Sequence, residues 1–300
     1  MRPFLRPRLL IPVVALTAAA AGIGTAAAKP ADPTSPDDPP VDGCRIEFAD
    51  PSDSADERRA RAACEAARAR FTELFGEPAP AARVVLRPRI GYRVATQGRL
   101  AVAFWPTTKV LEEQFGGGDA ATARVEDQWR NVLPHEITHA LLAAHFFGDE
   151  REPRRAGYGT PFPDWFDEGA AIWAESGDNR EVRLEDFRNL PEEWKDLRGI
   201  LAMPHPAVGN AAAFAARDGG PIPRDRALWA FYPQSFAVVS FVYEAGGQAA
   251  VRELARRLVE DPADLEALAG LPGLPETMDE VVAAWDAWRA ASPTSRTAPG

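Results

Sequence analysis

Residues 135–139 read His-Glu-Ile-Thr-His, and these residue types at this spacing could build a metal-dependent hydrolytic site. On a helix, His135 and His139 lie one turn apart on the same face, so both imidazoles can bind one ion. Glu136 stands beside that face, where it can take a proton from a water held by the ion. Zinc lowers the pKa of such a water to about 7. The spacing therefore predicts a zinc site with Glu136 as general base; the alternative is a helix that is merely polar here.

Two histidines do not complete a catalytic zinc site, because such sites use three protein ligands and leave one position to water. Downstream, residues 163–175 predict a second helix, with Asp164 as N-cap and Asp167 in a capping box. Glu168 on this helix is one candidate for the third ligand. Glu175 shares its face and could hold the outer ring nitrogen of a zinc-bound histidine.

His145 is the other candidate for the third ligand. It lies where the pattern H-E-x-x-H-x-x-G-x-x-H places its last histidine. That pattern needs a glycine where the chain leaves the helix, and this chain has Leu142 there. Because residues 141–144 favour continued helix, His145 would turn away from the ion. We interpret His145 as a residue near the helix end, where the helix dipole favours its charged form.

The start of the motif helix is left open by the sequence. Pro134 is tolerated in the first turn of a helix but disrupts a helix interior. Either the helix begins near Asn131 as N-cap, or a longer helix from about Ala120 kinks at Pro134. Both alternatives place the two histidines on a helix.

The two segments together resemble the gluzincin zinc metallopeptidases of the peptidase MA-like group. The pattern of that group is H-E-x-x-H followed by W-x-x-E-G-x-A, and this chain carries Trp165-Phe166-Asp167-Glu168-Gly169-Ala170 after its first motif. The resemblance covers roughly residues 80–290. It implies an acid behind one ligand at Glu175. The other roles that it implies are Glu136 as general base and, as zinc ligands, His135, His139 and Glu168.

The same resemblance implies an α+β fold of the zincin-like type with two lobes, a small N-terminal sheet with the active-site helix and a helical C-terminal lobe. It extends to residues 231–236, where related proteins often show a similar segment that opens a helix. Tyr232 is the candidate there for a hydrogen bond to the developing oxyanion; the alternative is an amphipathic residue at a helix entrance. Residues 100–105 are the candidate edge strand for pairing with extended substrate, unless they form an ordinary core strand.

Residues 1–28 read as a secretory signal peptide, with early arginines, an apolar alanine-rich run and Ala26-Ala27-Ala28 as a cleavage site. The alternative is an uncleaved membrane anchor, for which the run is barely long enough. We expect a secreted or periplasmic protein that is free of the membrane after cleavage. Residues 29–42 are predicted to be a disordered linker, residues 43–290 the metallopeptidase-like domain, and residues 291–300 a disordered tail.

Charge and cysteines narrow the class of protein further. The chain has 34 basic and 44 acidic residues, a net charge of −10, which becomes −13 without the three arginines of the predicted signal. Nucleic acid binds through basic patches, so no nucleic-acid partner is expected. Cys44 and Cys64 are the only cysteines. In an exported protein they are expected to form a disulfide, which would contribute about 3 kcal/mol.

The elements before the motif follow from caps and from alternating apolar residues. A helix is predicted over residues 54–75 and a strand over residues 82–86. Residues 92–96 and 99–105 predict a hairpin around Gln97 and Gly98. Together these elements would form the N-terminal sheet and the helix that covers it.

After the motif, Gly169 in the second zinc helix would let another backbone come close, as two helices around one ion require. Residues 203–226 form a long connection, and His205 within it is interpreted as a loop residue. The chain is predicted to be helical after Pro233. The last helix is predicted to be capped by Thr277 and Glu280.

These features predict an exported zinc metallopeptidase that hydrolyses peptide bonds in a peptide or protein substrate, with Zn²⁺ as cofactor. Two alternatives stay open. The first is a catalytically inactive zinc-binding module on the same scaffold, against which the intact Glu136 argues. The second is a zinc hydrolase of non-peptide amides or esters. Nothing in the sequence specifies an oligomeric state.

Overall fold

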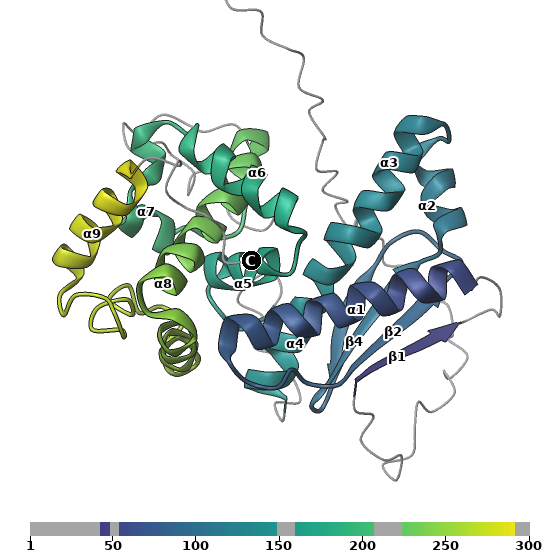
Figure 1. Cartoon of the computed structure of the whole chain (residues 1–300), viewed down its shortest axis with the longest axis horizontal. Coiled ribbons are helices and arrows are strands. Elements are labelled where there is room, and N and C mark those ends of the chain that lie inside the picture. The colour runs from purple at the N-terminus through teal and green to yellow at the C-terminus, as the bar shows by residue number, and fades with distance from the viewer. Residues whose placement is uncertain (1–42, 49–53, 149–159, 207–223, 292–300) are drawn as a thin grey trace, which may run out of the picture.

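The computed structural model describes residues 43–48, 54–148, 160–206 and 224–291. The predicted signal peptide and linker, and all but the first residue of the predicted tail, lie outside these ranges. The described part has a small four-stranded sheet with helices α1 to α4 in its N-terminal half and helices alone in its C-terminal half (Figure 1). This mixed arrangement agrees with the predicted α+β class. None of the described helices is long and apolar enough to cross a membrane.

The sheet has the strand order β1-β2-β4-β3. Strands β1, β2 and β4 are parallel, and β3 runs antiparallel to β4. The predicted hairpin is confirmed, with Gly98 at φ +58° in its turn. Of the two alternatives for residues 100–105, the ordinary inner strand is the one observed, because β4 lies between β2 and β3, and β3 forms one edge of the described sheet. The strands are β1 (Cys44–Phe48), β2 (Ala82–Arg87), β3 (Arg93–Gln97) and β4 (Leu100–Pro106).

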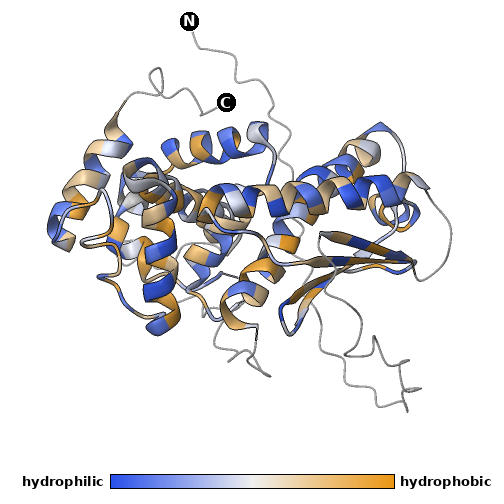
Figure 2. Cartoon of the chain, turned by 60° about the horizontal axis from the view of Figure 1, so that its bottom comes forward, coloured by the Kyte–Doolittle hydropathy of each residue, from blue (hydrophilic) through white to orange (hydrophobic). Residues whose placement is uncertain are grey.

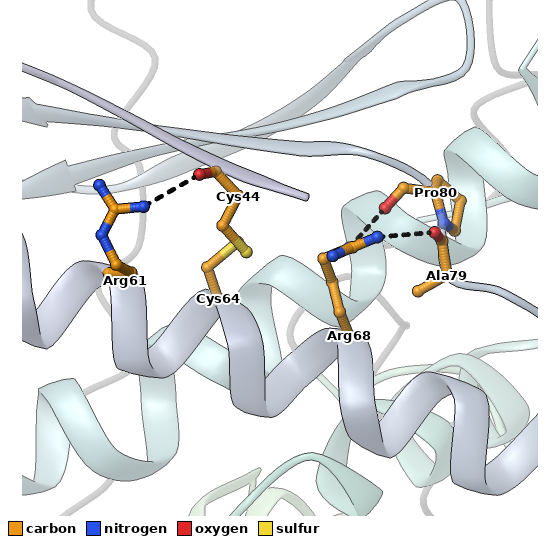
Figure 3. The surroundings of a disulfide bond; sticks show 6 residues. All are labelled: Cys44, Arg61, Cys64, Arg68, Ala79 and Pro80. Atoms are coloured by element: carbon orange, nitrogen blue, oxygen red, sulfur yellow. Dashed lines mark hydrogen bonds between the residues drawn. A yellow bond between two sulfur atoms is a disulfide. The ribbon is translucent and has the colours of Figure 1, made fainter. Parts of the chain in front are cut away.

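Strand β1, which the sequence did not predict, is tied to α1 (Ser54–Phe75) by a disulfide between Cys44 and Cys64 (Figure 3). Arg61 on α1 donates to the Cys44 carbonyl oxygen at 3.3 Å, and Arg68 donates to that of Pro80 at 3.0 Å (Figure 3). The disulfide therefore anchors a short strand that, among the described residues, pairs with β2 alone.

The helical segment before the motif resolves the question of Pro134. Helix α2 (Thr108–Phe115) ends at Gly116, and α3 (Asp119–Asp127) leads through a π-helical turn (Gln128–Val132) directly into α4 (Leu133–Phe147). The longer-helix alternative is therefore correct, and Asn131 is not an N-cap. A proline ring clashes with the carbonyl of residue i−4, and the wider π turn gives Pro134 room.

The C-terminal half consists of helices, several of which differ from expectation at their ends. Pro233 lies inside α8, which begins at Arg224, and the helical geometry of α8 is broken at Gly247. The Thr277 cap of the last helix is confirmed, with Thr277 Oγ1 accepting from the Glu280 N–H at 3.4 Å. The helices are α5 (Asp164–Trp173), α6 (Gly177–Arg188), α7 (Leu197–Leu201), α8 (Arg224–Glu260) and α9 (Met278–Ala290).

A continuous apolar core joins the two halves. In Figure 2 hydrophilic and hydrophobic residues follow one another along the helices, as expected for helices with one buried face. Helix α5 is buried almost all round and packs closely on α8. A Cβ atom on Gly169 would stand 2.4 Å from the Ser235 carbonyl oxygen. The predicted close approach at Gly169 is thus real, but the approaching backbone is that of α8 rather than of the motif helix.

Candidate metal centre

The motif residues lie on the first two turns of α4. The Nε2 atoms of His135 and His139 are 3.2 Å apart, and both side chains are buried. Thr138 Oγ1 donates to the Pro134 carbonyl oxygen, one turn earlier on the same helix, at 2.9 Å. The i, i+4 spacing thus brings two imidazole nitrogens to one point, as the sequence predicted.

Glu168 reaches the same point from α5. Its Oε2 atom lies 3.0 Å from His135 Nε2 and 3.8 Å from His139 Nε2, and its side chain is 1% exposed. One ligand atom from each of the three residues falls within 4.8 Å of the other two. The structure therefore brings together the three residues that the sequence assigned as ligands, and this buried group could bind a metal ion.

The outer nitrogen of each histidine faces a carboxylate. His135 Nδ1 is hydrogen-bonded to Glu175 Oε1 at 3.0 Å, the arrangement expected from the sequence. Glu175 is held in turn by Asn179 and by Arg183 Nε at 3.4 Å. His139 Nδ1 lies 3.0 Å from Asp167 Oδ1, although its N–H is poorly aligned for a hydrogen bond. Such partners orient imidazole ligands and fix which nitrogen carries the proton.

Asp167 does not have the capping role that the sequence suggested. Helix α5 is capped by Pro163 without a side-chain hydrogen bond. Instead, Asp167 Oδ2 accepts from the backbone N–H of Thr160 at 3.0 Å, while its other oxygen faces His139. Asp164 Oδ2 accepts from the backbone N–H of His205 at 2.7 Å. Both carboxylates are thus occupied with tertiary contacts, which a local capping pattern cannot reveal.

His205 is a site residue that the sequence did not identify. It lies in irregular backbone, as expected, but its side chain is 1% exposed and its Nε2 is 3.3 Å from Glu168 Oε1. Since an ionised carboxylate only accepts, this nitrogen carries the proton. Tyr232 Oη lies 3.5 Å from the same nitrogen. His205 therefore holds the oxygen of Glu168 that does not face the two motif histidines.

The two candidate catalytic side chains border this group. Glu136 accepts a hydrogen bond from Tyr92, the residue just before β3, and is only partly buried. The Tyr232 ring lies 6.5 Å from the His135 ring, and the Arg183 guanidinium lies 5.6 Å from the Tyr232 ring centre. Tyr232 stands on α8 well after its first residue, so it does not open a helix as expected.

His145 is not part of the group. Helix α4 continues through it to Phe147, and His145 Nε2 pairs with Glu77 Oε2 at 2.8 Å. Its side chain is 24% exposed. The alternative ligand set ending in His145 is therefore not assembled in the described part of the chain.

The pKa values of the site residues reflect the carboxylates that surround the two motif histidines. Burial opposes charge on His135, but hydrogen bonds to Glu168 and Glu175 outweigh it and raise the pKa of His135 to about 10. Burial likewise opposes charge on His139, but Asp167 and Glu168 raise its pKa to about 9. Burial would raise the pKa of Glu168, yet His139 and the hydrogen bonds of His135 and His205 hold it well below its usual range.

This electrostatic setting suits a bound cation. With neutral histidines that carry their protons on Nδ1, the two facing Nε2 atoms both present lone pairs, which repel unless a proton or a metal ion stands near them. The nearby cationic side chain of Arg183 is hydrogen-bonded to Glu175. A metal ion would therefore replace protons on His135 and His139. The carboxylates that surround the site are those of Glu136, Asp167, Glu168 and Glu175.

In comparisons with known proteins, no family model matches this chain, and neither a curated protein nor a solved structure is significantly similar to it. The interpretation of the site consequently depends on its own residues and their geometry.

Proposed function

We propose that this chain is an exported zinc metallopeptidase of the gluzincin type with a zincin-like fold. The observation that carries the proposal is the convergence of His135, His139 and Glu168 on one buried point beside Glu136. A dead copy of such a site has no need to keep the base. Export is supported by the signal-like N-terminus and is compatible with the disulfide.

Zinc is the ion that fits the donor set best. Zn²⁺ binds nitrogen and carboxylate oxygen at about 2.0–2.2 Å, so two ligand atoms of a tetrahedral site stand roughly 3.3 Å apart. The three separations within the group are 3.0, 3.2 and 3.8 Å. Two imidazoles and one carboxylate also leave a fourth position for water or substrate, as catalytic zinc sites do.

The bound ion would act as a Lewis acid and make a water nucleophilic at neutral pH. Glu136 accepts the proton of the attacking water and then passes it to the leaving amine. Burial raises the pKa of Glu136 against the opposing charges of His139 and His135. A carboxylate with a raised pKa is the stronger base. Tyr232 donates a hydrogen bond to the oxyanion that develops on the substrate carbonyl.

The substrate backbone pairs with β3 rather than with β4. In the described part of the chain β3 pairs only with β4, so its outer edge has free backbone donors and acceptors. Tyr92, which precedes β3, touches Glu136. At the other end, a Cβ atom on Gly148 would stand 3.2 Å from the Gly98 carbonyl oxygen, so α4 runs along β3. An extended peptide on this edge would pass the general base.

The test is cleavage of a diverse peptide mixture by the zinc-loaded mature protein, read by mass spectrometry, with Glu136→Gln as control. We expect cleavage that stops with a chelator, returns with zinc and is absent in the control. Cleavage that persists in Glu136→Gln would contradict the assignment of the base. A protein that holds one zinc and cleaves no peptide would point to the amide, ester or binding-module alternatives.

A further inference from the structure

Three arginines lie close together from the last residue of β2 to the first residue of β3, and we call Arg87, Arg89 and Arg93 the arginine cluster. Arg89 and Arg93 are exposed, and Arg87 is half-buried. The Arg87 guanidinium lies 4.5 Å from the centre of the Phe104 ring, and its Nε atom is buried without a hydrogen-bond partner. Arg87 thus packs on Phe104, and the two exposed arginines are near enough for their charges to act on it.

No carboxylate neutralises this cluster within the described residues. Arginines on the helices meet carboxylates at close range, as Arg59 does with Glu126 at 2.8 Å. The arginine cluster has no such pair in the described part of the chain, although the chain as a whole has a net charge of −10. Burial, followed by the charges of Arg89 and Arg93, lowers the pKa of Arg87. Three like charges without a counter-charge repel one another, so a bound anion would relieve the repulsion.

The position of the cluster connects it to the candidate site. Tyr92 lies between Arg89 and Arg93 in the sequence, and its side chain is hydrogen-bonded to Glu136. Its ring centre is 5.2 Å from that of Trp105, which holds the segment against the core. Arg93 is the first residue of β3, the edge strand. Because Arg93 pairs with Phe104 in the sheet, its side chain lies on the sheet face opposite the one that carries Trp105 and Tyr92. The arginines therefore stand at the start of the free edge, where alternate side chains of an extended peptide would point toward them.

We propose that this enzyme prefers peptides with aspartate or glutamate side chains close to the cleaved bond, bound by Arg89 and Arg93. The inference rests on the proposed peptidase function and names its substrate class. Guanidinium groups form charge-assisted and often bidentate hydrogen bonds with carboxylates, so two neighbouring arginines select acidic over neutral side chains. The acidic charge of the remaining chain would repel such peptides elsewhere.

The experiment compares matched peptides. The starting point is any peptide that the protein cleaves. At each position flanking the cleaved bond, one pair of peptides carries Asp or Asn and a second pair carries Glu or Gln. The ratio of kcat/KM for the acidic to the neutral peptide is measured in low and high salt. We expect a ratio of about five or more at the favoured position, decreasing as salt screens the charges.

The variant Arg89→Gln/Arg93→Gln should bring the ratio close to one, and Arg89→Glu/Arg93→Glu should invert it. Both positions are exposed, and thermal unfolding of each variant checks that it is folded. Arg256→Gln, an exposed arginine paired with Glu253 on α8, is the matched control and should keep the wild-type ratio. If Arg256→Gln also lost the preference for acidic peptides, the effect would be one of general charge, and the assignment to the arginine cluster would be overturned.

The two levels of the proposal fail in different ways. Chelator-sensitive cleavage with equal rates on acidic and neutral peptides would overturn the acidic preference and leave the peptidase intact. No cleavage of any peptide by zinc-loaded protein would overturn the peptidase function and the preference with it.

Discussion

The two ends of α4 each present a histidine to a glutamate, with very different results. His135, near the start, contacts Glu168 and Glu175 from another part of the fold, and all three side chains are at most 10% exposed. His145, near the end, pairs with Glu77, and these side chains are 24% and 37% exposed. The residue types do not distinguish the two pairs. What distinguishes them is burial and the convergence of further groups on the same atoms.

The difference has an energetic meaning. A half-exposed ion pair such as His145–Glu77 contributes about 0–1 kcal/mol and asks for no further partner. A buried cluster with several carboxylates would cost several kcal/mol per unpaired charge, so it requires cations. In the chain alone protons on His135 and His139 fill this need; a divalent ion could fill it as well.

The largest effect is expected from Glu168→Ala compared with Glu77→Ala. Each variant removes the carboxylate facing one histidine of α4. Glu168→Ala should lose most of the zinc and all measurable peptidase activity, because a ligand and a buried counter-charge are gone. Glu77→Ala should keep both. Metal analysis after dialysis, together with peptide cleavage, checks this. Equal zinc content in the two variants would contradict a special role for Glu168.

Glu136→Gln should reduce kcat by roughly 10²–10⁴-fold, the usual contribution of a general base. The zinc content should stay that of the wild type, because Glu136 is not among the converging ligand groups. Kinetics on one defined peptide, with metal analysis of the same sample, separates the two quantities. A parallel fall in zinc would mean that Glu136 supports binding rather than chemistry.

Glu175→Ala and Asp167→Ala test the carboxylates behind the histidines. Each should weaken zinc binding by about 10–100-fold, because the imidazole loses the partner that orients it. Competition with a chelator of known affinity gives the change. Glu185→Ala, which removes an exposed acid on α6 that is not among the partners of the two histidines, should have no effect on affinity. An unchanged affinity in Glu175→Ala would show that His135 is held by packing alone.

The smallest effect at the centre is expected from His205, a positioning residue. His205→Ala removes the N–H that contacts Glu168 Oε1, which should lower zinc affinity by about five-fold. His205→Gln keeps a side-chain donor and should recover most of that loss. The same chelator competition measures both. Equal losses in the two variants would indicate that His205 acts through packing against Phe231 and Tyr232 instead.

Local patterns predicted the parts of the molecule that depend on local physics. The helix over residues 54–75, the hairpin and the Thr277 cap follow from caps, alternation and turn residues, and the structure contains them. The spacing of His135 and His139 fixes their convergence on any helix. Glu168 and Glu175 became candidates through a motif, and the structure places both at the histidines.

The missed features depend on tertiary contacts. His205 lies in irregular backbone, and no spacing rule connects it to Glu168. A histidine within a long connection was the only signal that the sequence offered. The position of Asp167 suits a helix cap as well as a tertiary contact. The structure buries its side chain, where it contacts Thr160 and His139. Strand order cannot be read from local patterns either, so the sequence left open whether residues 100–105 form an edge strand or an inner strand, and the structure places them inside the sheet beside β3. The π turn before Pro134 resolved a conflict that propensity alone left open.

The most direct test of the central claim is X-ray absorption spectroscopy at the zinc edge of the zinc-loaded protein. Our account predicts one zinc per chain, bound by two histidine nitrogens and by oxygen ligands, with the second histidine signal lost in His139→Ala. A spectrum with three histidine nitrogens, or a protein that retains no zinc, would contradict the site formed by His135, His139 and Glu168.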